Sequence, residues 1–159
     1  MFKFLKSNKG ITIAAPCNGE IVTIDQVPDA VFAQKMVGDG FAIIPSSNDI
    51  HSPVDGEVIQ VFPTYHAICL KSTDGLEIIV HIGIDTVELK GEGFTCHTSV
   101  GANVKAGDLL LSFSPEILAA KGKNSITPVV ITNQEVLKSL KVETGLTHTA
   151  DTVAKITLK

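Results

Sequence analysis

The sequence predicts an all-β fold, an antiparallel β-sandwich or barrel with a few short helices. Short runs rich in Val, Ile, Leu and aromatic residues recur along the chain, turn residues stand between them, and helical periodicity is scarce. Such alternation is typical of antiparallel sheets. The expected strands are residues 11–14, 19–24, 41–44, 56–62, 65–71, 76–84, 109–113, 129–132 and 153–158.

Two short helices are expected among these strands. Ser114-Pro115-Glu116 supplies an N-cap, a proline at the first helical position and an early acid, and Gly122 supplies a stop. Asn133 is a suitable cap for a second helix over residues 134–140. A single helical turn is also expected after Asp29.

An internal repeat predicts two similar β units. Residues 15–22, Ala-Pro-Cys-Asn-Gly-Glu-Ile-Val, resemble residues 52–59, Ser-Pro-Val-Asp-Gly-Glu-Val-Ile. Each copy has a proline, a glycine turn and then a β run, which suggests packing around a pseudo-twofold axis. Residues 100–108 begin a further strand in the manner of lipoyl-like barrels, so the expected architecture is of the hybrid-barrel type.

Length and composition indicate one folded domain. With 159 residues, 44% of them hydrophobic and 19% charged, the chain has enough apolar side chains for a compact core. No apolar run is long enough to span a bilayer, and the first residues lack the apolar core of a signal peptide. Three cysteines without C-x-x-C spacing predict reduced thiols and a cytoplasmic location. We expect a short tail over residues 1–9 and a single domain over 10–159.

The charged residues restrict the partners. The formal net charge is −4 and no basic cluster occurs, which argues against nucleic-acid binding. All 13 basic residues are lysines, so the chain contains no arginine. It therefore supplies no bidentate guanidinium clamp for a phosphate, and any such clamp must come from a partner.

His66 and His81 are the most informative residues of the chain. Each lies in a β-type run, and Ser-Thr-Asp-Gly at residues 72–75 predicts a hairpin turn between them. A two-residue turn, at 73–74 or at 74–75, puts both imidazoles on one face of the hairpin because side-chain direction alternates along a strand. A three-residue loop would instead put them on opposite faces.

A histidine pair suits metal binding, acid–base catalysis or phosphoryl transfer. Zinc needs further ligands, and acid–base catalysis usually needs a poised carboxylate beside the pair, of which none is obvious within the hairpin. Phosphoryl transfer needs less, because a neutral imidazole is a nucleophile whose tautomer a backbone carbonyl can fix. The second histidine and the Thr64 hydroxyl can donate to the phosphoryl oxygens. The sequence has no Walker-type phosphate loop.

Four longer motifs follow one another along the chain. They are residues 27–40 (Val-Pro-Asp-Ala-Val-Phe-Ala-Gln-Lys-Met-Val-Gly-Asp-Gly), 62–67 (Phe-Pro-Thr-Tyr-His-Ala), 80–94 (Val-His-Ile-Gly-Ile-Asp-Thr-Val-Glu-Leu-Lys-Gly-Glu-Gly-Phe) and 127–133 (Thr-Pro-Val-Val-Ile-Thr-Asn). With them the chain resembles the glucose-family enzyme IIA of the bacterial phosphoenolpyruvate-dependent sugar phosphotransferase system. The resemblance covers residues 11–159.

This resemblance implies a phosphohistidine carrier, a phosphotransferase component of sugar uptake. It implies that His81 carries the phosphoryl group on Nε2, that His66 stabilises the group and that Thr64 supports His66. The phosphocarrier HPr would deliver the group, and a cysteine in the IIB domain of a membrane sugar transporter would receive it. No cofactor is required for this transfer.

The resemblance also allows regulatory partners and a metal. Related enteric proteins bind permeases and metabolic enzymes, and can share a zinc ion between the two histidines and a partner carboxylate. His66 and His81 are thus implied as zinc ligands in such a complex. Enteric relatives have a longer membrane-associating tail, whereas residues 1–9 are expected to anchor weakly at best and without stable insertion.

A docking surface is expected around the histidines. Carboxylates there can hold an arginine of the partner while the phosphoryl group lies between the two proteins. The expected apolar rim is Val31, Phe32, Val37, Phe62, Ile79 and Ile82, and the expected acids are Asp29, Asp85 and Glu88.

Two other classes of protein are alternatives. Residues 81–85, His-Ile-Gly-Ile-Asp, reproduce the His-x-Gly-x-Asp motif of lysostaphin-like zinc metallopeptidases, which share the hybrid-barrel fold. Those enzymes also need a later His-x-His, whereas His97 and His148 stand alone. A biotinyl or lipoyl carrier needs a lysine at a hairpin tip, but Lys71 precedes its turn.

Overall fold

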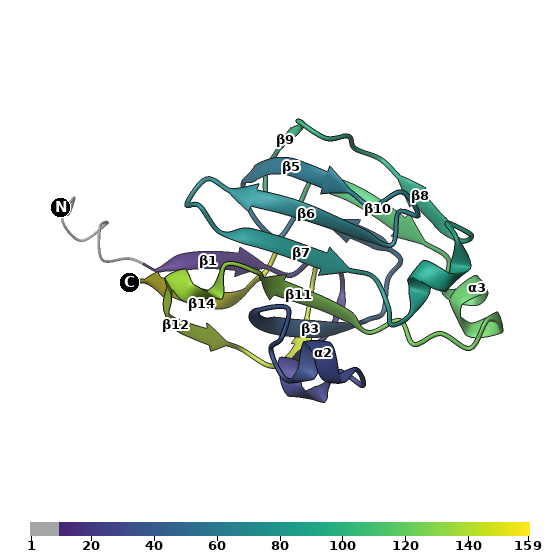
Figure 1. The fold of residues 1–159 in the computed structure, drawn as a ribbon, viewed down its shortest axis with the longest axis horizontal. Helices are drawn as coiled ribbons and strands as arrows, with labels where there is room; N and C mark the ends of the chain where they lie inside the picture. Colours follow the sequence, from purple (N-terminus) through teal and green to yellow (C-terminus); the bar gives the residue numbers. More distant parts are fainter. Residues whose placement is uncertain (1–9) are drawn as a thin grey trace.

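The described part of the chain, residues 10–159 of a computed structural model, forms three antiparallel sheets (Figure 1). The largest has eight strands in the order β13-β2-β3-β11-β7-β6-β5-β9, and the other two are β1-β14-β12 and β4-β10-β8. The strands are β1 Ile11–Ala14, β2 Gly19–Thr23, β3 Asp39–Pro45, β4 Asp49–His51, β5 Gly56–Val61, β6 Ala67–Ser72, β7 Glu77–His81, β8 Phe94–Cys96, β9 Asn103–Val104, β10 Leu109–Phe113, β11 Thr127–Ile131, β12 Leu137–Val142, β13 Gly145–Thr147 and β14 Thr152–Leu158. The predicted all-β antiparallel class is confirmed.

Within residues 10–159, five short helical segments join these strands. They are η1 Ile24–Gln26, α2 Ala30–Ala33, η2 Thr86–Leu89, α3 Pro115–Ala120 and η3 Gln134–Val136. The predicted caps are present, because Ser114 Oγ accepts from the Ile117 N–H at 3.2 Å and Asp29 accepts from the Val31 N–H at 2.9 Å. Within residues 10–159, no helix is long and apolar enough to cross a membrane. The expected tail, residues 1–9, lies outside the described residues.

The helix expected over residues 134–140 is wrong. Only the turn η3 forms there, and β12 follows and pairs with β14. A β-bulge between Leu137 and Ser139 adds one residue to the strand. Leu137 and Leu140, three positions apart, therefore both pack against the core. The bulge imitates helical spacing in the sequence.

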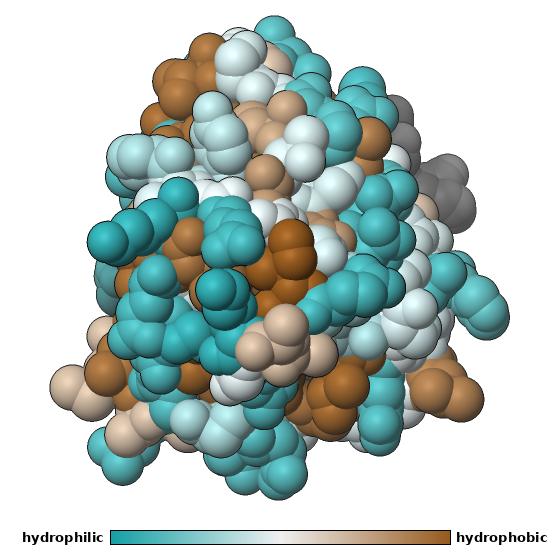
Figure 2. All heavy atoms as spheres, turned by 90° about the vertical axis from the view of Figure 1, so that its right-hand side faces the viewer, coloured by the Kyte–Doolittle hydropathy of each residue, from teal (hydrophilic) through white to brown (hydrophobic). Residues whose placement is uncertain are grey.

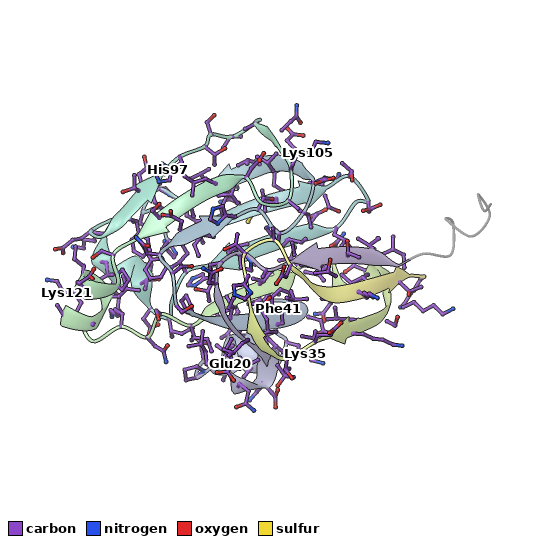
Figure 3. The ribbon with its side chains drawn as sticks, turned by 180° about the vertical axis from the view of Figure 1, so that it is seen from behind. Glu20, Lys35, Phe41, His97, Lys105 and Lys121 are labelled. Carbon is purple, nitrogen blue, oxygen red and sulfur yellow. The ribbon has the colours of Figure 1, made fainter. Side chains whose placement is uncertain are left out.

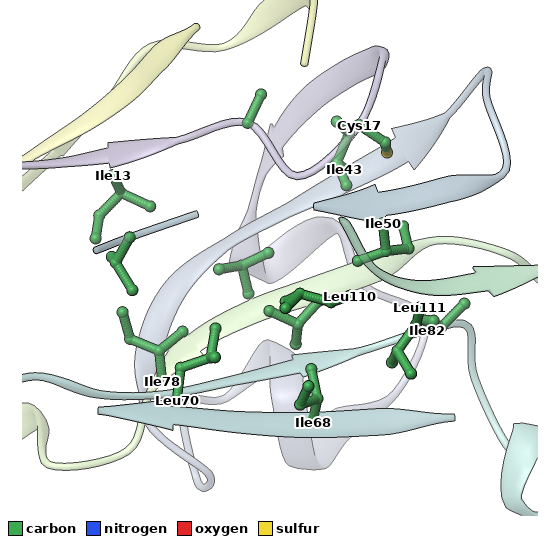
Figure 4. Close-up of a cluster of buried hydrophobic side chains, with 14 of the residues drawn as sticks. Ile13, Cys17, Ile43, Ile50, Ile68, Leu70, Ile78, Ile82, Leu110 and Leu111 are labelled. Carbon is green, nitrogen blue, oxygen red and sulfur yellow. The ribbon is translucent and has the colours of Figure 1, made fainter. Parts of the chain in front are cut away.

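One core is filled by side chains from all three sheets. Isoleucine and leucine side chains dominate it, and Figure 4 shows part of this cluster around Ile43, Ile68 and Leu110. The inward positions of the eight-stranded sheet alternate, as in β7, where Ile78 and Val80 are buried while Ile79 and His81 are only partly so. His81 thus belongs to the outer face of the sheet.

The internal repeat forms a pseudo-twofold arrangement. Pro16 and Pro53, 37 positions apart, occupy equivalent places: the Ala14 N–H donates to the Pro53 carbonyl at 2.8 Å, and the His51 N–H donates to the Pro16 carbonyl at 2.7 Å. In the eight-stranded sheet, β2 and β3 on one side of the β11–β7 pair correspond to β5 and β6 on the other. The sequence repeat is therefore a structural repeat.

A second backbone hydrogen bond also occurs at equivalent positions of the two units. The Gly107 N–H donates to the Ser52 carbonyl at 2.8 Å, and the Ala150 N–H donates to the Ala15 carbonyl at 2.9 Å. Gly107 has φ +96° and Ala150 has φ +74°, so the same left-handed position carries glycine in one unit and alanine in the other.

The two units differ in the segments that join their first two strands. Residues 24–38 join β2 to β3 and include α2, whereas the shorter segment 62–66 joins β5 to β6. A second, smaller apolar cluster includes Ile24, Val27 and Phe32 from the longer segment with Val130 and Ile84. This cluster covers the outer face of the sheet and brings Phe32 to the end of β7, beside His81.

Candidate functional site

The structure brings the His66 and His81 rings together at the end of the eight-stranded sheet. Their ring centroids lie 5.0 Å apart with an interplanar angle of 81°. His81 is the last residue of β7 and is partly buried, while His66 directly precedes β6 and is 4% exposed. Figure 2 shows the face of the molecule at the right of Figure 1, toward which β7 runs, with apolar side chains among polar ones.

The predicted hairpin turn is corrected. Lys71 pairs with Glu77 and the Ser72 N–H donates to the Leu76 carbonyl, so the loop has three residues and not two. Ala67 is therefore the residue opposite His81.

The His66 side chain does not lie on the face of the sheet that strict alternation from Ala67 would predict. It follows a tight turn in which the Tyr65 N–H donates to the Phe62 carbonyl at 2.8 Å and Tyr65 has φ +59°. Because His66 lies outside the ladder, its ring can turn toward His81 while its backbone carbonyl accepts from the Ile82 N–H at 2.7 Å. The rings converge by this turn and not by hairpin register.

The tautomer of His81 is fixed by the backbone. Nδ1 of His81 lies 2.8 Å from the Gly83 carbonyl oxygen, which can only accept a hydrogen bond. The ring proton is therefore on Nδ1, and Nε2 has a free lone pair. Sequence reasoning expected a backbone carbonyl in this role but did not identify it; a glycine two positions after the histidine was the available signal.

Thr64 holds His66 from the other side. Its hydroxyl and Nδ1 of His66 form a hydrogen bond of 2.5 Å. A hydroxyl that donates to Nδ1 leaves the His66 proton on Nε2, where it serves as a donor. The Phe62 ring packs edge-on against His66, with centroids 5.3 Å apart.

Both histidines are neutral near pH 7. Burial, with a smaller contribution from the His81 charge, lowers the pKa of His66 to about 4. Burial also lowers the pKa of His81, although the Gly83 carbonyl and the carboxylates of Asp29 and Asp85 partly oppose that shift. A neutral imidazole with a free Nε2 is a competent nucleophile.

The expected apolar rim is only partly at the surface. Val31 is 47% exposed, whereas Phe32 is buried against His81 with ring centroids 5.2 Å apart. Val37, Phe62 and Ile79 are partly buried. Ile82 is fully buried in the main core, as Figure 4 shows, so its expected place in the docking rim is wrong. As the residue after β7, it points inward where His81 points outward.

The three expected acids have different surroundings. Asp29 caps α2, and Asp85 is exposed with φ +59°. The negative charge of each carboxylate favours the protonated form of His81 and so opposes the lowering of its pKa by burial. Glu88 forms an ion pair with Lys123, a residue that sequence reasoning did not consider. A cation of this chain thus already engages Glu88.

The other three histidines make their contacts outside this site. His51 contacts the Pro16 carbonyl, His148 lies 3.7 Å from Asp151, and His97, labelled in Figure 3, contacts the Ser112 hydroxyl at 2.8 Å. Within residues 10–159, no three His, Cys, Asp or Glu side chains form a metal-binding group. His66 and His81 alone supply two of the four ligands of a tetrahedral zinc ion, so a partner would have to complete the set. The metallopeptidase alternative lacks its ligands in this part of the chain.

Comparisons with known proteins agree with the motifs. Residues 11–137 match the family described as phosphoenolpyruvate-dependent sugar phosphotransferase system, EIIA 1. The chain is 49% identical over 150 residues to the PTS system glucose-specific EIIA component of Bacillus anthracis, which covers 93% of this chain and 91% of that protein.

A solved structure and a longer relative extend the match. The glucose permease IIA from Mycoplasma capricolum superposes with a TM-score of 0.88 at 41% identity, covering 98% of this chain and 99% of that one. The PTS system glucosamine-specific EIICBA component of Bacillus subtilis is 46% identical over 143 residues, which are 89% of this chain and 23% of that protein.

Proposed function

The chain belongs to the EIIA 1 family of the phosphoenolpyruvate-dependent sugar phosphotransferase system, and we propose that His81 is its phosphoryl carrier. In this proposal Nε2 of His81 attacks the phosphorus of phosphorylated HPr, so a new N–P bond forms as the N–P bond of HPr breaks. A cysteine thiolate of a IIB domain then attacks the phosphorus and releases Nε2. The observation that carries the proposal is the hydrogen bond from Nδ1 to the Gly83 carbonyl, which keeps Nε2 available.

His66 is the proposed stabiliser of the transferred group. Its ring lies 5.0 Å from that of His81, and a proton on its Nε2 can be donated to a phosphoryl oxygen. The Thr64 hydroxyl supports this role by holding Nδ1 of His66. Such transfer depends mainly on positioning and charge stabilisation, so few further groups are needed.

The charges around His81 favour a partner with arginine. Asp29 and Asp85 place negative charge near a group that receives a phosphoryl anion, and the chain contains no arginine. A guanidinium from the partner would neutralise the phosphoryl group and pair with these carboxylates across the interface. The same residues would then serve docking to HPr and to the IIB domain.

The name of the Bacillus subtilis relative supports the IIB partner, since it joins components C, B and A in one protein. Direct transfer between neighbouring components is the simplest use of that arrangement. The free thiols of Cys17, Cys69 and Cys96 are compatible with the proposed cytoplasmic location.

Intact-mass measurement after incubation with phosphoenolpyruvate, enzyme I and HPr tests the proposal. The wild-type protein should gain one phosphoryl group, and His81→Gln should gain none. His51→Gln, which changes a histidine outside the site, should be labelled like wild type. A labelled His81→Gln protein would refute the assignment, as would a wild-type protein that stays unlabelled. Transfer from the labelled protein to a panel of IIB domains would then identify the transporter.

A further inference from the structure

Thr86 is a buried polar residue close to His81 that the proposed transfer steps do not use. It is fully buried at the start of η2, and its hydroxyl donates to the Ile82 carbonyl. Its Cγ2 methyl lies 2.6 Å from the position that a Cβ at Gly83 would occupy. The hydroxyl thus binds the Ile82 carbonyl, and the methyl fills the space in which a side chain at Gly83 would lie.

The turn after His81 is held by several hydrogen bonds. The Ile82 N–H donates to the His66 carbonyl at 2.7 Å, and the Ile84 N–H donates to the Asn124 carbonyl at 3.0 Å. Gly83 has φ +77°, a left-handed conformation that glycine adopts about as readily as conformations with negative φ. The orientation of the Gly83 carbonyl therefore depends on what holds the neighbouring peptides.

The peptide between Ile82 and Gly83 is the link to the imidazole. Its carbonyl accepts from Thr86, and φ and ψ of Gly83 together relate this peptide to the next one, which carries the Gly83 carbonyl and whose N–H, on Ile84, donates to Asn124. The Gly83 carbonyl is the acceptor for Nδ1 of His81. Loss of the Thr86 hydroxyl would also leave the Ile82 carbonyl without this partner in a buried place, which favours rearrangement of the turn.

We infer that Thr86 is a positioning residue for His81: its hydroxyl fixes the Ile82–Gly83 peptide, and this keeps the Gly83 carbonyl directed at Nδ1 and the lone pair on Nε2. The inference separates the two ends of the side chain, since the hydroxyl sets the tautomer while the methyl only fills space over Gly83. Its kinetic consequence rests on the proposed function, but its effect on the tautomer does not.

Nuclear magnetic resonance of the ¹⁵N-labelled imidazole rings tests the inference in the unphosphorylated protein. Wild type and Thr86→Ser, which keeps the hydroxyl, should both show His81 with the proton on Nδ1. Thr86→Val, which keeps the shape but loses the hydroxyl, should show a mixture with a substantial Nε2–H fraction. Phosphoryl acceptance from HPr should be slowed about tenfold in Thr86→Val, or ~1.4 kcal/mol in activation free energy, and little changed in Thr86→Ser.

Ser52→Ala is the matched control for loss of a buried hydroxyl. Ser52 is fully buried and donates to the Val54 carbonyl at 2.6 Å, in the repeat region and not in the turn after His81. Its variant should lose stability as Thr86→Val does, yet leave the His81 tautomer and the acceptance rate at wild-type values. Thr86→Ala, which removes the same hydroxyl and adds no bulk, replaces Thr86→Val if that variant does not fold.

The outcomes separate this inference from the proposed function. A His81 ring that stays fully Nδ1-protonated in Thr86→Val or Thr86→Ala would overturn the positioning role. A tautomer change in Ser52→Ala of the same size would overturn it too, because the effect would then follow from stability alone. If the tautomer shifts as expected but wild-type His81 never accepts a phosphoryl group, the proposed function fails and the positioning role stands.

Discussion

The His66 and His81 rings meet at 81° with their centroids 5.0 Å apart, although the two residues are not opposite each other in the β6–β7 ladder. Ala67 occupies that place, and His66 lies just beyond the ladder, held by Thr64 and by the turn through Tyr65. The two rings consequently have separate supports: the backbone of Gly83 for His81 and a side chain for His66. Each of these two hydrogen bonds can therefore be altered by substitution without altering the other.

Replacing His66 with glutamine should separate acceptance from onward transfer. The variant keeps the His81 nucleophile and its Gly83 partner, so the labelled mass should still appear at the endpoint. Transfer to a IIB domain should be slower by about 100-fold, the usual cost of losing a donor to developing charge. Rapid-quench measurement of the loss of label checks this, and a variant that transfers at the wild-type rate would contradict the role of His66.

Stability should fall with acid because of His66. Its pKa is about 4 in the folded protein against 6.5 for an ordinary histidine, so the unfolded chain binds the proton first as the pH falls. The stabilising difference is fully present above pH 6.5 and is lost progressively down to about pH 4, by about 3 kcal/mol. Denaturant unfolding of wild type and His66→Gln between these pH values checks this. The two pH profiles should diverge over this window, and parallel profiles would show that His66 is not the cause.

The charge of Asp29 should serve partner binding. Asp29→Asn removes the charge but keeps an oxygen that can cap α2, so the fold should be retained. Acceptance from HPr should slow by about threefold at low salt and become less salt-dependent, as expected for loss of a charge at an interface. Asp25→Asn, in the exposed turn η1, is the matched control. Equal effects of the two variants would indicate net charge and not a specific contact.

Gly83 should tolerate no side chain. A Cβ there would lie 2.6 Å from the Thr86 methyl and 2.8 Å from the Asn124 carbonyl oxygen, at φ +77°. We expect Gly83→Ala to reduce the free energy of unfolding by about 2–4 kcal/mol. Gly75→Ala, at φ +91° with no atom within 4 Å of the new Cβ, should reduce it by only about 1–2 kcal/mol. Similar losses in the two variants would mean that the contacts around Gly83 relax freely.

The pseudo-twofold repeat predicts a stabilising change. Ala150, at φ +74°, stands where the other unit has Gly107, so Ala150→Gly should remove left-handed strain and raise the free energy of unfolding by about 1 kcal/mol. The reciprocal variant Gly107→Ala should lower it by a similar amount. Thermal or denaturant unfolding measures both. A destabilised Ala150→Gly would mean that chain entropy outweighs the relieved strain at this position.

Local patterns were sufficient for the fold class and for most strands. Each of the nine predicted β runs overlaps a strand, and the N-caps at Ser114 and Asp29 are where the sequence put them. These features depend on neighbours in the chain, so local chemistry determines them. The helix expected over residues 134–140 failed because a β-bulge reproduces the three-residue spacing of a helix face, and only pairing with β14 decides between them.

The sequence by itself determined the family, the histidine pair and the repeat, because these are written in residue identity and spacing. Tertiary structure decided the rest. The burial of Ile82 and the ion pair of Glu88 with Lys123 depend on contacts between distant segments. The three-residue loop and the hydrogen bond from His81 Nδ1 to the Gly83 carbonyl depend on the local backbone geometry that the folded chain adopts. Side-chain direction in a strand follows from register, and register and turn geometry are set where strands pair. The sequence therefore indicates that the two imidazole rings meet. Only the packed fold shows that the turn through Tyr65 brings them together.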